Sequence, residues 1–458
     1  MYIKIKVGTL VFWLAVVLLT VGIASAIRDD PKPDRLVSLI IDSNPMHDDR
    51  IDIRPSGHGY SQANDRKVSY AQALAYAQEM VQEYPEHPWS QEHSAYTLGH
   101  LYLKNGNRTE ALKWFTEALS SFRAQEAHRW IDLLRPQVGE SSSPALSGRV
   151  LIGGEPQSGA IVYLQPADAS NWNSPGYLYN QATMTDDNGE YWFYNIEPGR
   201  YEVGVGLTPE QVDGWVRAEA PQEVLALESG TTHTFDVQFV PKLQTIAPGN
   251  GEEIGEEELH FQWEPYPGAV SYKLHIQSIE LSSDGSLLSS SSGSLQEDWP
   301  GTEAVYTIAE LRGYARGIHW NEDGPLPATI LGVVYPGGHF SWSVDAYDEQ
   351  GLRISSSTSY YGTNGGQMPL FSMSDEGQLA GDRHVLARDW EEAIAAYKQE
   401  EHHQEAIRAL GLIYAFGEDL RGEGKNNELA LSYLNRLTNP TAFDLQALDS
   451  LDWDAQRE

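Results

Sequence analysis

The spacing of hydrophobic positions changes twice along the chain. From residue 66 to 138, and again from 374 to 458, apolar residues recur every three or four positions, which predicts amphipathic helices. From residue 145 to 362, apolar and polar residues alternate in short runs separated by turns rich in Gly and Pro, which predicts β-strands. We therefore expect a multidomain α and β protein, with two β-sandwiches between short α-helical repeat (α-solenoid) segments.

The first 26 residues have the form of an export signal. Lys4 and Lys6 precede an apolar run over residues 7–26, which closes on the small-residue sequence Ala-Ser-Ala at 24–26. This order is typical of a signal peptide. The run is also long enough to cross a bilayer, so the alternative is that it is not cleaved and anchors the protein in the plasma membrane. In both cases the rest of the chain lies outside the membrane, which predicts an extracellular or cell-surface protein.

Residues 27–65 contain Pro, Asp and Gly and show little periodicity. We expect a linker here, with a short strand at residues 36–41.

The helical segment at 66–138 resembles tetratricopeptide repeats. The residues that carry the resemblance are Leu98, Gly99, Tyr102, Ala111 and Phe115. The small Gly99 and Ala111 are expected where the two helices of a hairpin cross closely, with Tyr102 and Phe115 filling the space beside them.

The C-terminal segment, 374–458, repeats this spacing with Gly381, Ala393 and Tyr397. Arrays of this kind generally present a groove to peptide segments. The resemblance therefore implies a protein partner that is bound by the helical repeats.

The most specific pattern lies in residues 145–240. Strand-like runs are joined by an Asn-Gly turn at 188–189 and a Pro-Gly turn at 198–199. The order of these runs resembles the carboxypeptidase regulatory-like domain, a transthyretin-like β-sandwich. The resemblance implies a module without catalytic residues. Alternation places Tyr191 and Phe193 on its core face.

Five aromatic residues of this module form a candidate ligand surface. Alternation turns Trp192 and Tyr194 away from the core, and the loop before them adds Trp172, Tyr177 and Tyr179. We interpret them as a platform for sugar rings or peptide, because flat rings give contact area at low entropic cost. The alternative is that these rings pack under a loop or against a neighbouring domain.

Residues 241–362 resemble a fibronectin type III-like sandwich. Trp263 on an early strand and Trp342 in a late alternating strand carry this resemblance and are expected in the core. The Ser-rich stretch at 282–294 and the long excursion at 298–324 have no role that the sequence assigns.

Composition narrows the function. The chain has 458 residues, no Cys and a net charge of -34. The charge argues against nucleic acid as a partner. The missing Cys excludes disulfides and thiol chemistry, and it fits a bacterial envelope. The sequence has no zinc-peptidase pair, nucleophile elbow or Gly-rich phosphate loop, so we expect no enzyme, metal or cofactor.

These observations predict a non-catalytic, exported cell-envelope scaffold or protein-interaction protein. The alternative is a carbohydrate-binding surface protein that uses the exposed aromatics of the 145–240 sandwich. In both interpretations the membrane is contacted only through the N-terminal segment.

Overall fold

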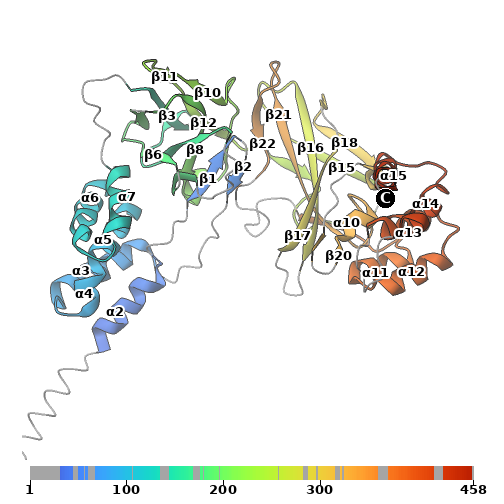
Figure 1. Ribbon diagram of the computed structural model, residues 1–458, viewed down its shortest axis with the longest axis horizontal. Helices are drawn as coiled ribbons and strands as arrows, with labels where there is room; N and C mark the ends of the chain where they lie inside the picture. Colours follow the sequence, from blue (N-terminus) through green and yellow to red (C-terminus); the bar gives the residue numbers. More distant parts are fainter. Residues whose placement is uncertain are drawn as a thin grey trace, which may run out of the picture.

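The computed structural model describes most of the chain (Figure 1). The described residues are 31–44, 50–55, 57–59, 68–105, 107–134, 144–168, 176–178, 180–194, 196–255, 257–281, 287–295, 298–314, 320–321, 324–358, 360, 370–416 and 426–455. Two helical units lie at the ends of the molecule, and two β-sandwiches lie between them. The multidomain α and β architecture is thus as predicted, whereas a tetratricopeptide or solenoid arrangement of the helices stays a prediction.

The N-terminal helical unit comprises residues 31–44 and 68–134. Its helices are α2 (Pro31–Asp42), α3 (Tyr70–Glu83), α4 (Pro88–Glu92), α5 (Ser94–Lys104), α6 (Arg108–Glu117), the 3-10 helix η1 (Ala118–Ser120) and α7 (Ala124–Leu134). Ser69 and Gln72 form a capping box at the start of α3, and Pro88 is in the first turn of α4. Helix α2 packs against α3 and α5 against α6, so the unit is built from helical pairs, with α7 at its end.

The segment expected as a linker is structured in most of its described residues. Residues 36–41, expected as a strand, lie in α2, because Leu36 and Ile40 are four residues apart and share one buried helix face with α3. Strands β1 (Ile51–Arg54) and β2 (Gly57–Gly59) follow. The chain therefore enters the first sandwich at β1, and helices α3 to α7 are inserted before the sandwich continues at β3.

Sandwich 1 is formed by the described residues within 50–59 and 144–241. Its remaining elements are β3 (Leu146–Ile152), β4 (Glu155–Pro156), β5 (Ile161–Pro166), η2 (Gly176–Leu178), β6 (Gln181–Met184), β7 (Glu190–Phe193), β8 (Gly199–Leu207), α8 (Pro209–Val212), β9 (Trp215–Arg217), β10 (Val224–Leu227), β11 (His233–Thr234) and β12 (Val237–Pro241). One sheet has the order β2-β1-β8-β5-β6 with β10 also on β8. The other has the order β11-β3-β12-β9 with β4 and β7 on β3. Tyr191 and Phe193 are fully buried between them, as alternation predicts.

Sandwich 2 follows from residue 245. Its elements are β13 (Thr245–Ala247), β14 (Glu253–Ile254), β15 (Glu258–Trp263), β16 (Ser271–Leu281), β17 (Leu287–Ser294), β18 (Glu303–Thr307), α9 (Ile308–Gly313), β19 (Trp320–Asn321), β20 (Gly324–Pro325), α10 (Pro327–Leu331), β21 (His339–Tyr347), β22 (Arg353–Ser356) and β23 (Leu370–Met373). A three-stranded sheet, β13-β15-β18, faces the sheet β14-β23-β21-β16-β17, in which β22 also pairs with β21. Trp263 and Trp342 are buried, as predicted. Strand β23 extends this sheet past the expected boundary at residue 362.

The C-terminal helical unit contains α11 (Ala380–Ala387), α12 (Trp390–Gln399), α13 (Gln404–Phe416), α14 (Asn427–Leu434) and α15 (Ala442–Ala455). Its helices pack as the pairs α11–α12 and α13–α14. A Cβ atom on Gly381 would lie 2.4 Å from the ring of Tyr397. At the N-terminal unit, a Cβ atom on Gly99 would lie 2.7 Å from the ring of Phe115. The predicted reason for these small residues, a close crossing of paired helices, is confirmed.

Hydrogen bonds join the two sandwiches along one edge. The Glu219 N–H donates to the Arg353 carbonyl (2.9 Å), and the Ser355 hydroxyl donates to the Pro241 carbonyl (2.8 Å). Strand β22 of sandwich 2 therefore lies along the edge of sandwich 1 that β9 and β12 form. Because backbone groups are fixed on both sides, this junction restricts rotation of one sandwich against the other.

The described helices are all shorter or more polar than a bilayer span requires. The predicted signal peptide or anchor, residues 1–26, lies outside the described residues.

Candidate functional site

The apolar face of the N-terminal helical unit is occupied by sandwich 1. Tyr96, Leu103 and Trp130 from α5 and α7 belong to one hydrophobic cluster with Ile161 of β5 and Met184 of β6. The helical-repeat resemblance implies a groove for a protein partner but does not say on which face of the helices it lies. Here those side chains contact the same chain.

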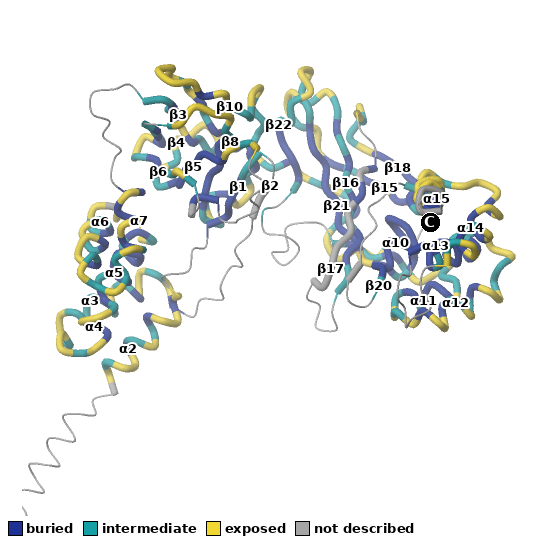
Figure 2. The backbone as a smooth tube through the Cα atoms, viewed as in Figure 1, coloured by how far each residue is buried: buried dark blue, intermediate teal, exposed yellow. Residues whose placement is uncertain are grey.

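The C-terminal helical unit likewise packs against a segment of the same chain, residues 325–336, which are all buried. Helix α10 within this segment packs on α11 and α13, and the backbone there is coloured as buried in Figure 2. The Arg388 side chain donates to the Pro325 carbonyl (3.4 Å), and the Gln378 amide donates to the Pro336 carbonyl (3.2 Å). Residues on either side of α11 therefore hold both ends of this segment through its backbone carbonyls.

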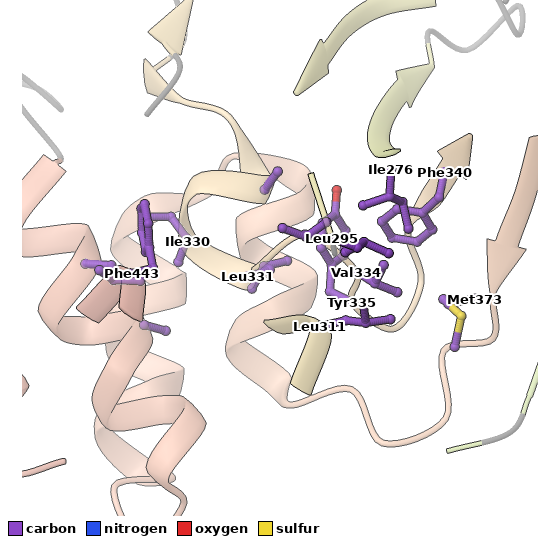
Figure 3. Close-up of a cluster of buried hydrophobic side chains, with 14 of the residues drawn as sticks. Ile276, Leu295, Leu311, Ile330, Leu331, Val334, Tyr335, Phe340, Met373 and Phe443 are labelled. Atoms are coloured by element: carbon purple, nitrogen blue, oxygen red, sulfur yellow. The ribbon is translucent and has the colours of Figure 1, made fainter. Parts of the chain in front are cut away.

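Sandwich 2 and the C-terminal helical unit thus share one hydrophobic core. Figure 3 shows Tyr335 beside Phe340 of β21 on one side, and Ile330 of α10 beside Phe443 of α15 on the other. Burial raises the pKa of Tyr335 to about 12, and its hydroxyl hydrogen-bonds with that of Ser278 (2.8 Å). Apolar side chains of both helical units thus pack within the chain, and a protein partner of the helices stays a prediction.

The predicted aromatic surface is only partly assembled. Trp172 and Tyr179 lie outside the described residues. Tyr177 is 3% exposed, because its ring packs over Gly206 and lies edge-on to Tyr163 at 6.2 Å between ring centroids. Tyr177 is therefore a packing residue between sandwich 1 and the helices, which is the alternative that the sequence left open for it.

Trp192 and Tyr194 are half-exposed on the outer side of sandwich 1. Tyr191 and Phe193, the neighbours of Trp192 in β7, are both fully buried. Trp192 is in none of the hydrophobic clusters of the described residues, whereas Tyr177 is in the one that joins the helices to the sandwich.

Two rows of polar side chains accompany Trp192 on this sheet face. In register with Trp192 lie Ser147 of β3 and Thr234 of β11. Two residues further along the strands, Glu190 pairs with Arg149. Sequence alternation found Trp192, but it did not find these neighbours, because strand register joins segments that are far apart in the chain.

Several buried titratable groups hold elements together. The Asp52 carboxylate of β1 accepts hydrogen bonds from the Tyr163 hydroxyl and from the Gly176 N–H (2.8 Å). Burial and the adjacent Asp52 raise the pKa of Tyr163 far above its ordinary value. In the C-terminal unit the Tyr397 hydroxyl donates to Asp382 (2.6 Å), and burial raises the pKa of both groups. Nowhere in the described ranges do three or more acidic or His side chains converge as metal ligands.

Comparisons with known proteins find similarity only among solved structures. No protein-family model and no curated protein matches the chain. A DUF3823 family protein from Bacteroides ovatus is 10% identical (TM-score 0.16), and the alignment covers 50% of this chain and 97% of that chain. BcpA, the major pilin subunit of Bacillus cereus, is 10% identical (TM-score 0.19; 49% and 68% covered). The FN1–FN3 domains of chicken CNTN1 are 13% identical (TM-score 0.13; 47% and 62% covered). Similarity at this level does not identify a ligand or a partner.

Proposed function

We propose that this chain is a non-catalytic, exported binding protein that acts as a scaffold, with two sandwiches holding two helical units at a fixed separation. The observation that carries this proposal is the continuity of packing across each junction. The N-terminal helices share a hydrophobic cluster with sandwich 1, and the C-terminal helices share a core with sandwich 2. Hydrogen bonds also join the sandwiches to each other, from the Glu219 N–H to the Arg353 carbonyl and from the Ser355 hydroxyl to the Pro241 carbonyl.

The absence of Cys allows a direct test of this rigidity. Ile41 in α2 and Leu445 in α15 are 63% and 50% exposed, and they lie in the two helical units. Spin labels on the double variant Ile41→Cys/Leu445→Cys should give one narrow distance distribution. Glu219→Ala, which removes the carboxylate that accepts from the Arg353 N–H (3.1 Å), should broaden it. Asp168→Ala, an exposed position away from the junctions, is the control and should leave it unchanged.

A broad distance distribution in the labelled chain that carries no further substitution would contradict the scaffold proposal. Photo-crosslinkers on the same two Cys residues, used on intact cells, then test the binding function. The proposal expects different neighbouring molecules at the two ends, because the ends are held apart.

Carbohydrate binding is a second candidate function. It is favoured by Trp192, a large aromatic side chain that is half-exposed outside every hydrophobic cluster of the described residues. An aromatic ring held in this way offers an apolar face to a ligand at little cost in side-chain entropy.

A further inference from the structure

We infer that the outer face of the β7-β3-β11 sheet binds a neutral polysaccharide, with a sugar ring stacked on the indole of Trp192. The inference rests on the proposed binding function and specifies its ligand. This face, here called the Trp192 face, is defined by Trp192, Ser147, Thr234, Glu190, Arg149 and Asp236.

The first row of the Trp192 face suits one sugar ring. Trp192, Ser147 and Thr234 lie side by side on three neighbouring strands. Adjacent strands are about 4.8 Å apart, so the row spans about 10 Å. An indole at one end provides a flat apolar surface for the C–H face of a ring. Two hydroxyl groups at the other end both donate and accept hydrogen bonds, as the hydroxyl groups of a sugar require.

The second row adds an ion pair, Arg149 with Asp236, and the carboxylate of Glu190. The Arg149 N–H donates to the Asp236 carboxylate (2.8 Å), and the Arg149 guanidinium lies 3.6 Å from the same carboxylate. Glu190 is across from Arg149 in the strand pair. The Arg149 side chain is 50% exposed, so solvent and a ligand can reach part of it. Paired charges of this kind can exchange hydrogen bonds with neutral hydroxyl groups without leaving a net charge to attract an anion.

The net charge of the chain favours some classes of polysaccharide as ligands over others. The chain carries a net charge of -34, which repels polymers of uronic acids or phosphates. The Trp192 face itself contributes one cation, Arg149, and two carboxylates, Glu190 and Asp236. The chemistry of the face therefore fits neutral sugar units rather than acidic ones.

The test is binding of the full chain to immobilised polysaccharides. Neutral glucans, mannans and xylans form one arm, and alginate and polygalacturonate form the other. Trp192→Ala should weaken binding to a neutral polymer about tenfold or more, and Trp192→Phe should retain part of it. Arg149→Ala should change the preference among neutral polymers. Phe122→Ala removes a 63% exposed ring on the N-terminal helical unit and is the matched control, with no effect expected.

Three results of the binding assay would overturn the inference. They are no binding to any neutral polymer, binding that Trp192→Ala leaves unchanged, and binding restricted to the acidic polymers. Loss of a protein crosslink on substituting Trp192 would assign the face to a protein partner and would also overturn it. None of these outcomes alters the distance between the two labelled ends, so failure here is distinguishable from failure of the scaffold proposal. Thermal unfolding of each variant shows whether it is folded.

Discussion

Asp52 and Tyr163 are 111 residues apart in the chain and are joined by a buried hydrogen bond from the tyrosine hydroxyl to the carboxylate. Asp52 lies on β1, and Tyr163 lies on β5 of sandwich 1. The second oxygen of Asp52 accepts the Gly176 N–H. One side chain from the segment between α2 and α3 thus fixes both strand β5 and the 3-10 helix η2 of the sandwich.

Replacing Asp52 with alanine should destabilise sandwich 1 by about 3 kcal/mol, because it leaves the Tyr163 hydroxyl and the Gly176 N–H buried without their acceptor. Urea unfolding measures the loss. Asp34→Ala is the control, since the Asp34 side chain is 84% exposed, and its effect should stay within about 0.5 kcal/mol. Equal effects of the two substitutions would show that the buried bond contributes little.

The sequence could not predict the role of β1. Its four residues are too few to show a period, and their partner strand β8 lies about 150 residues later (Ile51 is opposite Leu207). Leu36 and Ile40 in α2 have the four-residue spacing of a helix. The apolar residues between them obscure this spacing in the sequence. Local patterns therefore gave the type of the longer elements, whereas long-range pairing decided which segments complete the sandwich.

Gly99→Ala should destabilise the N-terminal helical unit by about 1–3 kcal/mol, although alanine favours helices, because the added Cβ would lie 2.7 Å from the Phe115 ring. Thermal unfolding measures the effect. The double variant Gly99→Ala/Phe115→Leu should be less destabilised than the sum of the two single variants, since the smaller side chain makes room for the methyl group. Strict additivity would mean that the ring and the glycine do not interact in this way.

The candidate site was predictable only in part. Alternation around Tyr191 and Phe193 correctly placed Trp192 on the outer face. The position of Tyr177 was not predictable, because its burial depends on Gly206, which leaves room for the ring on a distant strand. Ser147 and Thr234 carry no signal of their own, and only the register of three strands brings them beside Trp192.

The ion pair between Arg388 and Glu280 should couple the C-terminal helical unit to sandwich 2. One guanidinium nitrogen lies 2.7 and 2.8 Å from the two carboxylate oxygens, and the side chains are only 14% and 24% exposed. A double-mutant cycle with Arg388→Ala and Glu280→Ala should give a coupling energy of about 1–3 kcal/mol in urea unfolding.

The matched control for this cycle is the pair Arg383 and Asp375, which is 4.0 Å apart and exposed on both sides. Its coupling energy should be below about 0.5 kcal/mol. If the Arg388 cycle gave a value as small as the control, the shared hydrophobic core alone would hold the helices to sandwich 2.

Asp345 on β21 should make sandwich 2 sensitive to acid. Burial by itself would raise the pKa of Asp345, but the hydrogen bond with His275 (3.1 Å), the nearby Ser356 side chain and the charge of Arg353 outweigh burial and lower this pKa. A carboxyl group whose pKa is lowered by folding stabilises the protein above the ordinary value of about 3.9, and this contribution is lost as pH falls through the folded-state pKa.

Asp345→Asn removes this titration and should cost about 2 kcal/mol at pH 7, because the charged hydrogen bonds are lost. The difference in unfolding free energy between the unchanged chain and the variant should hold down to about pH 4 and shrink below it. Urea unfolding at pH 7, 5, 4 and 3 measures this difference, with Asp375→Asn, 78% exposed, as the control. A difference that stays constant to pH 3 would mean that Asp345 has the same pKa in the folded and unfolded chains, and its pairing with His275 would then contribute no acid sensitivity.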